Sequence, residues 1–306
     1  MRAVFEGVCP NCGGRISDSR LLMGLPCEKC LPVPDEELAK ELRSLKREEI
    51  ISYCLEKLKE LGTLKRYGEL AEFHAKVADF EDFFRRAVGC PPWSAQRTWA
   101  RRALVGKSFA IVAPTGSGKT AFGLALALYL ASKGRRSYIL VPTSLLAKQV
   151  HERARALAER AGASVHVVCY HSMLTKKAAE KALKAISEGA FDVLITTSFF
   201  LSRRHELLEG QKFDFIFVDD VDAFLRSSKN VDVVLRLLGI PAEAVEKALE
   251  VLRLRTEVAR RLRAGEKGPE LDELREKLAD LEAELETVRS SSGKGILVVS
   301  GATIRA

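Results

Sequence analysis

The sequence predicts an α/β fold in which a parallel sheet is covered by helices on both faces. From Pro91 onward, short apolar runs alternate with segments long enough to form a helix. The runs are residues 109–113, 138–141, 165–168, 193–196, 215–218 and 296–299. Continuous apolar strands separated by helices are typical of parallel sheets that are buried on both sides. A Gly-rich stretch directly after the first run and an acidic cluster directly after the fifth support this prediction, because each stands where a strand would end.

The Gly-rich stretch predicts a phosphate-binding loop. Its sequence is Ala113-Pro114-Thr115-Gly116-Ser117-Gly118-Lys119-Thr120, between an apolar run and a helical segment. Glycines let backbone N–H groups point at phosphate oxygens, and the helix N-terminus adds partial positive charge. We expect residues 114–120 to bind ATP, with Lys119 on the β- and γ-phosphates and Thr120 on Mg²⁺. Ala113 stands where such loops usually have their first glycine.

The acidic cluster predicts the remaining groups of the same site. Residues 215–218 lead directly into Asp219-Asp220-Val221-Asp222. Asp219 is best placed to bind the water shell of Mg²⁺, and Asp220 to orient or deprotonate an attacking water. Lys119, Asp219 and Asp220 are therefore the predicted catalytic residues. Several adjacent carboxylates repel one another unless a cation is near, which argues against a purely structural cluster.

Gln96 lies in the stretch 91–97, just before the first run, and is a candidate to bind adenine. An amide offers both the donor and the acceptor that adenine requires. Phe80 and Phe83 are candidates to stack on the base. The alternative for Gln96 is an ordinary surface glutamine.

Two segments that follow later runs are candidates for DNA contact. Pro142, Thr143 and Lys148 follow the second run, and Thr197 and Ser198 follow the fourth. Hydroxyls, backbone N–H groups and a lysine suit contacts with phosphates that do not read bases. The alternative is that these hydroxyls only cap helices.

Four cysteines near the N-terminus form a zinc signature. Two CxxC pairs, Cys9 with Cys12 and Cys27 with Cys30, are separated by 14 residues. Four thiolates fill a tetrahedral zinc ion, so the predicted role is structural rather than catalytic. A module of this kind either also touches nucleic acid or only stabilises a small fold, and the sequence leaves both possibilities open.

Changes in composition predict four regions. Residues 1–34 form the zinc module, and residues 35–90, with leucines at helical spacing, form a helical linker. Residues 91–240 and 293–306 form the nucleotide-binding domain, and residues 241–292 form a helical hairpin insertion.

The hairpin prediction rests on apolar spacing and charge. A coiled-coil seam is predicted by six residues that step by three and four: Leu271, Leu274, Leu278, Leu281, Leu285 and Val288. The preceding arm offers Val245, Leu249 and Leu252. The first arm is rich in basic residues and the second in acidic residues, so we expect them to fold against each other. The hairpin is either a solvated spacer or a contact with DNA or a neighbouring domain.

Bulk composition adds weaker indications. The net charge of +8 is compatible with a polyanionic partner, although it also serves solubility. Two Asn and three Gln in 306 residues, beside many Arg, Lys and Glu, favour a thermophilic source over genome bias. No apolar run approaches the roughly 20 residues that cross a bilayer, and no signal-peptide core precedes the cysteines. We expect a cytoplasmic protein with no membrane partner.

With these motifs in order, the sequence resembles the reverse gyrase family. The resemblance is carried by the zinc cysteines, the stretch 92–99, the loop 113–120 and the Asp219-Asp220-Val221-Asp222 cluster. It implies a RecA-like P-loop domain of helicase superfamily 2 that drives ATP-dependent positive supercoiling of DNA, an isomerase reaction. The implied cofactors are ATP, Mg²⁺ and Zn²⁺. The implied partners are DNA, a second RecA-like domain and a type IA topoisomerase region.

The resemblance also assigns roles near the end of the chain. Ser300-Gly301-Ala302-Thr303 looks like the motif that couples ATP hydrolysis to strand separation, with Asp222, Ala302 and Thr303 as the coupling residues. The sequence ends three residues later, so we expect a fragment, a truncated product or one subunit of a split enzyme. Without an arginine finger, worth roughly 10³–10⁵ in rate, we expect very slow hydrolysis. Two rival hypotheses are a fragment of another superfamily 2 DNA or RNA helicase and a non-enzymatic zinc-dependent DNA-binding module.

Overall fold

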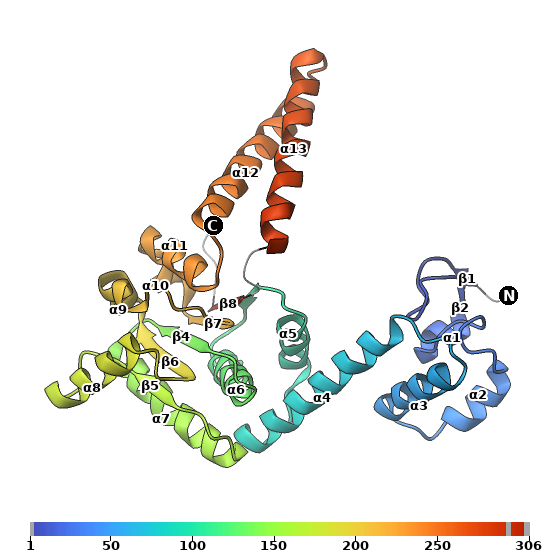
Figure 1. Cartoon of the computed structure of the whole chain (residues 1–306), viewed down its shortest axis with the longest axis horizontal. Coiled ribbons are helices and arrows are strands. Elements are labelled where there is room, and N and C mark those ends of the chain that lie inside the picture. Colours follow the sequence, from blue (N-terminus) through green and yellow to red (C-terminus); the bar gives the residue numbers. More distant parts are fainter. Residues whose placement is uncertain (1–2, 292–294, 303–306) are drawn as a thin grey trace. The chain divides into compact units, whose positions relative to one another are not determined.

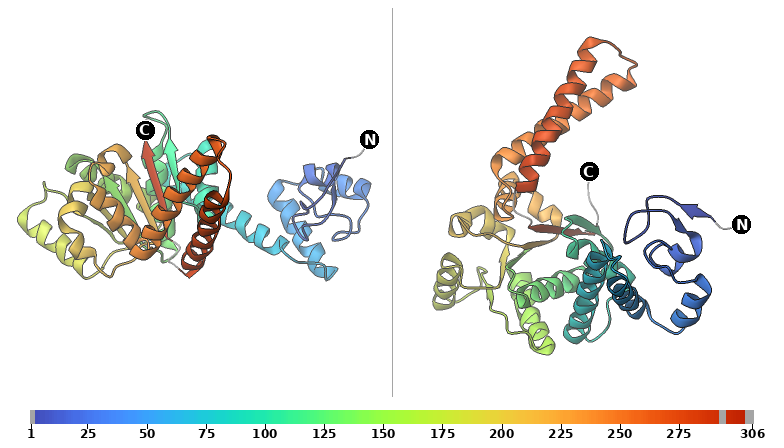
Figure 2. Two further views of the ribbon diagram at one scale, coloured as in Figure 1. Left: turned by 90° about the horizontal axis from the view of Figure 1, so that it is seen from above. Right: turned by 45° about the vertical axis from the view of Figure 1, so that its right-hand side comes forward.

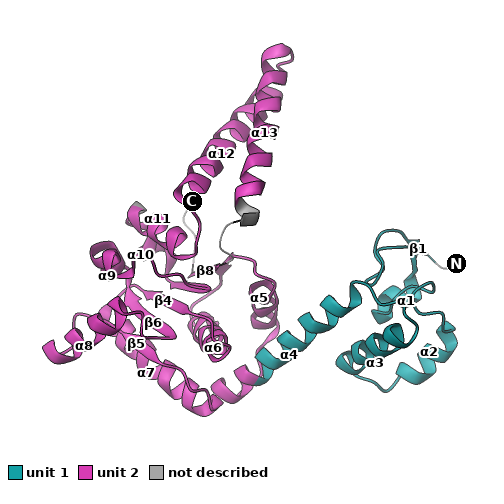
Figure 3. Ribbon diagram, in the orientation of Figure 1, with its two compact units in different colours: residues 1–82 teal, residues 83–306 magenta. Residues whose placement is uncertain are grey.

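The computed structural model describes residues 3–291 and 295–302. The chain forms two compact units, residues 1–82 and residues 83–306 (Figure 3). The division falls within helix α4 (Tyr67–Val88), whereas the sequence suggested boundaries after residues 34 and 90.

Unit 1 joins the predicted zinc module and the predicted linker in one core. Its elements are the antiparallel strands β1 (Val4–Phe5) and β2 (Ile16–Ser17), then helices α1 (Asp18–Met23), α2 (Asp35–Leu42), α3 (Arg47–Glu60) and most of α4 (Figure 1). Ile16 and Leu31 of the cysteine-rich part pack with Leu38, Leu58 and Tyr67 of the helices. A module of about 30 residues buries too little surface to be stable without a metal, disulfides or further packing. The helices that follow it in sequence therefore also complete its hydrophobic core.

Two buried polar side chains tie this unit together. Asn11, between two of the cysteines, donates to the Thr63 carbonyl at 2.9 Å and accepts from the Lys65 N–H at 2.8 Å. Arg20 is 1% exposed and forms an ion pair with Asp35 at 2.7 Å. Its guanidinium also donates to the carbonyl of Leu31, and so fixes the chain where the cysteine-rich part ends.

Unit 2 is built on a six-stranded parallel sheet, as the apolar runs predicted. The strands are β3 (Phe109–Val112), β4 (Ser137–Val141), β5 (Val167–Cys169), β6 (Val193–Thr197), β7 (Phe215–Asp219) and β8 (Ile296–Gly301). Their spatial order is β3-β8-β7-β4-β6-β5, and every neighbouring pair is parallel. All carboxyl ends therefore lie along one edge of the sheet.

The helices of unit 2 cover both faces of this sheet (Figures 1 and 2). They are α5 (Ser94–Leu104), α6 (Lys119–Ser132), α7 (Ser144–Ala161), α8 (Lys176–Ser187), α9 (Ser198–Arg204), α10 (Val221–Leu225) and α11 (Ser228–Leu237), with a 3₁₀ turn at His205–Leu208. Crossovers β3–α6–β4 and β4–α7–β5 run in one direction across the sheet, and the later crossovers run back. Because such crossovers are right-handed, α6 and α7 cover one face while α8 to α11 cover the other.

The insertion before β8 is a hairpin of two long helices, α12 (Ala242–Arg263) and α13 (Pro269–Ser291), which lie side by side (Figure 2). Ion pairs join the basic arm to the acidic arm, among them Lys247 with Glu284 and Arg255 with Glu282. The inward face of α12 differs from the one expected. Its buried residues include Ala244, Val251 and Val258, whereas Leu249 and Leu252 are exposed.

Candidate nucleotide-binding site

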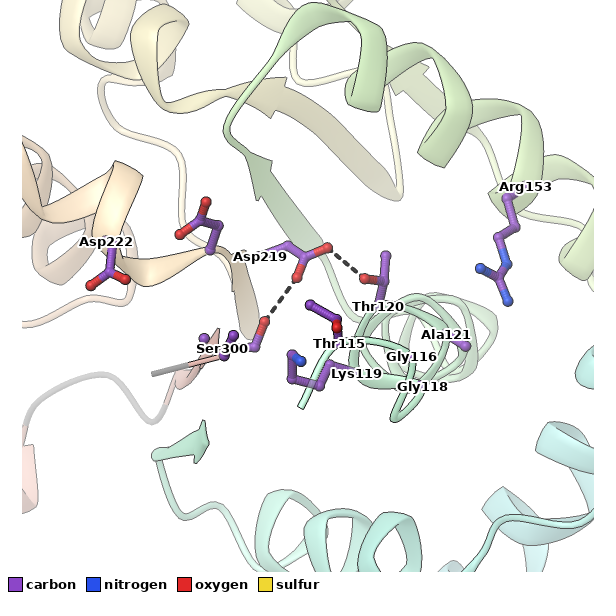
Figure 4. Close-up of a pocket in the computed structure, with 13 residues that line it drawn as sticks. Thr115, Gly116, Gly118, Lys119, Thr120, Ala121, Arg153, Asp219, Asp222 and Ser300 are labelled. Carbon is purple, nitrogen blue, oxygen red and sulfur yellow. Dashed lines mark hydrogen bonds between the residues drawn. The ribbon is translucent and has the colours of Figure 1, made fainter. Parts of the chain in front are cut away.

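A cleft of about 570 Å³ lies at the carboxyl ends of β3, β8 and β7 (Figure 4). These strands are neighbours in the sheet but distant in sequence. Their ends bring together most of the residues predicted from three separate motifs. The lining residues are Thr115, Gly116, Gly118, Lys119, Thr120, Ala121, Arg153, Asp219, Asp220, Asp222, Ser300, Gly301 and Ala302. Thr303, the third predicted coupling residue, lies outside the described residues.

The loop 113–118 curls around the ammonium group of Lys119. The Nζ atom donates to the carbonyl oxygens of Ala113 at 2.7 Å and Pro114 at 2.9 Å. Ser117 has its backbone N–H directed to the Pro114 carbonyl, and its Oγ has no partner among the described atoms. Lys119 thus stabilises the curled loop, and a phosphate would have to compete with these two carbonyls for its protons.

Asp219 is the centre of the site. Its Oδ2 accepts a hydrogen bond from the Thr120 hydroxyl at 2.6 Å, and its Oδ1 accepts one from the Ser300 hydroxyl at 2.8 Å (Figure 4). Ser300 is opposite Asp219 in the β7–β8 register. One carboxylate therefore connects the helix after the loop, the acidic strand and the last strand. Thr120 and Asp219 are hard oxygen ligands of the kind that Mg²⁺ takes in phosphate sites.

Asp220 has an unusual backbone. Its φ of 73° is the only positive φ of a non-glycine residue in the described part of the chain. Its side chain caps α10 by accepting from the Ala223 N–H at 3.5 Å, and its own N–H donates to the Ser300 carbonyl at 3.0 Å. Such a conformation costs about 1–3 kcal/mol and is found mainly at functional sites. It turns the chain sharply after Asp219 and leaves Asp220 lining the cleft.

Gln96 fixes the loop in this structure. Its Oε1 accepts from the Trp93 N–H at 3.2 Å, and its Nε2 donates to the Gly118 carbonyl at 3.3 Å. A Cβ at Gly118, where φ is 79°, would lie 2.8 Å from that Nε2 atom, so the contact requires glycine. Both ends of the amide are engaged and the side chain is 5% exposed. Phe80 and Phe83 are buried as well.

Arg153 of α7 lines the cleft and was not found by sequence reasoning. Its side chain extends toward the start of α6 (Figure 4). The residue lies 33 positions after Thr120 in the sequence, within a helix of ordinary amphipathic pattern, so no local motif marks it. Only the packing of α7 beside α6 brings it to the cleft.

The residues predicted to contact DNA lie at the carboxyl ends of β4 and β6, which are adjacent strands. The two threonine hydroxyls are engaged within the protein. Thr143 and Thr197 each accept a backbone N–H at 3.2 Å as N-caps of α7 and α9. Thr197 and Ser198 are each 7% exposed, whereas Lys148 is exposed. The capping alternative therefore describes the hydroxyls of Thr143 and Thr197 in the structure.

The four cysteines of unit 1 form one cluster whose ligand atoms all lie within 4.8 Å of one another. The Sγ atoms of Cys12 and Cys27 are 3.6 Å apart, close to the roughly 3.8 Å expected between thiolates bound to a tetrahedral zinc ion with Zn–S bonds of about 2.3 Å. Backbone N–H groups of Gly14 and Cys27 point at Sγ atoms of the cluster at 3.3 Å. The donor set fits zinc.

The closeness of the four thiols favours a bound cation. Burial alone would raise the pKa of Cys9, but the backbone N–H groups of Cys12, Cys27 and Asn11 lower it to about 7. Burial and the neighbouring thiols raise the pKa of Cys30 to about 12. Four thiols this close cannot all ionise unless a metal compensates their charge.

Each unit contains a segment that matches a model of a known protein family. Residues 1–49 match the family model described as reverse gyrase zinc finger, and residues 93–248 match the model described as DEAD/DEAH box helicase. Among described residues, no helix is both long and apolar enough to cross a membrane.

Reverse gyrases from several organisms are similar over most of the chain. The protein from Pyrococcus horikoshii is 46% identical over 86% of this chain and 16% of its own length. Reverse gyrase 1 of Aquifex aeolicus is 43% identical over 99% of this chain and 24% of its own length. The protein from Pyrobaculum aerophilum is 42% identical over 97% of this chain and 23% of its own length. The chain thus spans about a sixth to a quarter of these curated relatives, and a thermophilic source is consistent with them.

Proposed function

This chain belongs to the DEAD/DEAH box helicase family, and we propose that it is the ATP- and DNA-binding, helicase-like module of a reverse gyrase. In this role, its affinity for DNA would depend on which nucleotide is bound. ATP-dependent positive supercoiling would require a type IA topoisomerase in addition. The observation that carries the proposal is the Thr120–Asp219–Ser300 hydrogen-bond chain, because it connects the loop, the acidic strand and the last strand at one cleft.

The side chains suit binding and hydrolysis of a nucleoside triphosphate. Lys119 would exchange its two carbonyl partners for phosphate oxygens. Thr120 and Asp219 would hold Mg²⁺, which neutralises charge on the phosphates when bound. Asp220 lines the cleft beside Asp219 and is our candidate to orient water. Asp222 and Ala302 line the same cleft and are our candidates to couple nucleotide state to movement of the chain.

Coupling to DNA is supported by the arrangement of the sheet. The nucleotide residues follow β3, β8 and β7, and the candidate DNA residues follow the next strands, β4 and β6. Both sets lie on one edge of one sheet. A ligand of the first set that moves β7 or β8 would therefore act directly on the neighbouring strand ends.

The proposal is tested by binding of a fluorescent ATP analogue with Mg²⁺, in the presence and absence of a DNA bubble. Lys119→Ala removes charge-assisted hydrogen bonds worth about 1.5–3 kcal/mol each, so we expect affinity to fall by roughly 10- to 100-fold. Asp219→Asn should weaken binding in Mg²⁺ but change little in excess EDTA. DNA affinity should differ between the ATP analogue and ADP.

The control is Lys107→Ala, which removes an exposed lysine just before β3, at the opposite edge of the sheet. This variant should bind the analogue like the unmodified chain. Equal affinity of the unmodified chain and both cleft variants would rule out the cleft as the nucleotide site. DNA affinity that is independent of the nucleotide would leave a nucleotide-binding protein but refute the coupling.

A further inference from the structure

Three large apolar side chains are exposed just after β4, β5 and β6, at the carboxyl edge of the sheet. They are Leu145 at 56%, Met173 at 58% and Phe199 at 67% exposure. Each follows a different strand: Leu145 follows β4, Met173 follows β5 and Phe199 follows β6. We call these three residues the apolar row. A single exposed apolar residue needs no explanation, but three on three adjacent strands form a surface feature.

Contacts between sequence neighbours of the row join the three segments that carry it. Beside Leu145 and Met173, the hydroxyls of Ser144 and Ser172 are hydrogen-bonded at 2.8 Å. Beside Phe199, the Phe200 ring packs against Tyr170, with centroids 4.9 Å apart. Neighbouring strands are about 4.8 Å apart, so the row extends across the ends of β4, β6 and β5.

The hydroxyl groups nearest the row are already hydrogen-bonded within the protein. Thr143 and Thr197 cap helices, and the serine hydroxyls pair with each other. Beside the exposed Lys148, the row therefore offers solvent hydrocarbon and an aromatic ring rather than free hydroxyls. The sequence motifs had suggested hydroxyl contacts instead.

Positive charge surrounds the row. The Arg203 guanidinium lies 5.3 Å from the centroid of the Phe199 ring, and that of Arg204 lies 5.8 Å from the Tyr170 ring. Lys148, on the first turns of α7, is exposed and close enough to His171 to contribute to lowering its pKa, after burial. Apolar side chains set among cations are complementary to a polyanion that also exposes flat apolar faces.

We propose that the apolar row receives the bases of an unpaired DNA strand, with Phe199 as the stacking residue. The proposal rests on the proposed function, since it assumes that this edge binds DNA. A duplex hides the faces of its bases and offers mainly phosphates outside its grooves, whereas an unpaired strand exposes both phosphates and base faces. The row would therefore make this module prefer melted DNA without reading its sequence.

The test compares Phe199→Ala with the unmodified chain in anisotropy titrations of a 20-nucleotide oligo(dT) and a 20-base-pair duplex. Stacking on an aromatic side chain is worth about 1–3 kcal/mol per base, so affinity for oligo(dT) should fall by roughly 5- to 150-fold. Affinity for the duplex should change less than about twofold, and the salt dependence should stay the same. Val105→Ala, which removes a 51% exposed apolar residue outside the row, is the matched control.

Two further variants separate stacking from charge. Phe199→Trp should retain affinity for oligo(dT), and its indole fluorescence should be quenched on binding. Lys148→Ala should weaken both ligands and reduce the salt slope by about one phosphate contact.

The outcomes separate the two proposals. If the unmodified chain binds neither ligand, the proposed function fails together with the row. If it binds DNA but Phe199→Ala weakens neither ligand, or weakens both equally, the row is not a base-binding surface and the proposed function stands. If the variants leave DNA binding unchanged but abolish self-association, the row is a protein interface and our inference is wrong.

Discussion

Replacing Gly123 with alanine should destabilise unit 2, although alanine is the better helix former. Gly123 lies inside α6, and a Cβ there would meet three ring carbons of Phe217 at 2.5, 2.5 and 2.6 Å. Ordinary contacts begin at 3.4 Å, so the ring would have to retreat by roughly 1 Å from a position that is fully buried. Overpacking costs about 1–3 kcal/mol, and the gain in helix propensity offsets about 1 kcal/mol.

Three contacts this short place the cost in the upper part of that range, about 2–3 kcal/mol. The expected net loss is therefore about 1–2 kcal/mol, which lowers the Tm of a unit of this size by about 2–8 °C. Calorimetry of Gly123→Ala measures it. Gly68→Ala is the matched control, because Gly68 lies in α4 with no atom near its added Cβ and should gain up to about 1 kcal/mol. Adding Phe217→Leu to Gly123→Ala should partly relieve the clash. A Gly123→Ala protein as stable as the unmodified chain would refute this packing argument.

The same change should reach the nucleotide site. Phe217 is on β7, two residues before Asp219, and Gly123 is one turn after Thr120. Pushing α6 and β7 apart would lengthen the 2.6 Å contact between Thr120 and Asp219. Mg²⁺-dependent affinity for the ATP analogue should fall well below that of the Gly68→Ala control at a temperature where both variants are folded.

Three other predictions concern the parts around this site. Removing zinc with a chelator should unfold unit 1, because structural zinc contributes about 10–16 kcal/mol of apparent binding free energy. Binding of the ATP analogue by unit 2 should persist, and added Zn²⁺ should restore the helicity that circular dichroism shows to be lost. Asn11→Ala leaves three backbone groups without this side-chain partner, so a denaturant titration of unit 1 should show a loss of about 2 kcal/mol or more. Glu257 in the hairpin accepts hydrogen bonds from two arginines, which lowers its pKa to about 2. Its contribution to stability should be fully present above about pH 4.5 and should be lost as the pH falls through about 2. A carboxyl-carbon NMR titration of Glu257 with a midpoint near 4.5 would contradict this.

The fold was predictable because its signals are local. Each strand is a continuous apolar run, and each site motif directly follows such a run, so strand ends and chemistry were found together. The arm of the hairpin that was misjudged, with Leu249 and Leu252 outside, has apolar residues on more than one face. Periodicity alone could not choose between those faces, because the choice depends on which side meets α13.

The sequence could not predict which partners each polar side chain finds once the chain is packed. Gln96 has the right position for a ligand contact, but its amide is engaged by Trp93 and Gly118. Arg153 has no motif around it and reaches the cleft only because α7 packs beside α6. Asn11 stands at one of the two unspecified positions of a CxxC motif, so the motif predicts no role for it. In the structure its side chain nevertheless joins the cysteine-rich part to the helical part through Thr63.

Asp219 suggests how nucleotide and DNA could communicate in this unit. Its two oxygens are held by Thr120, next to the bound phosphates as proposed, and by Ser300 on β8. A Mg²⁺ ion that binds Thr120 and Asp219 must compete with at least one of these hydrogen bonds. The Ser300 carbonyl also accepts from the N–H of Asp220, so a shift of Ser300 when its hydroxyl releases Asp219 would also move the strained turn at Asp220. Ser300→Ala should therefore leave Mg²⁺–nucleotide binding largely intact but reduce the difference in DNA affinity between the ATP-analogue and ADP states, and an unchanged difference would show that coupling does not pass through this residue.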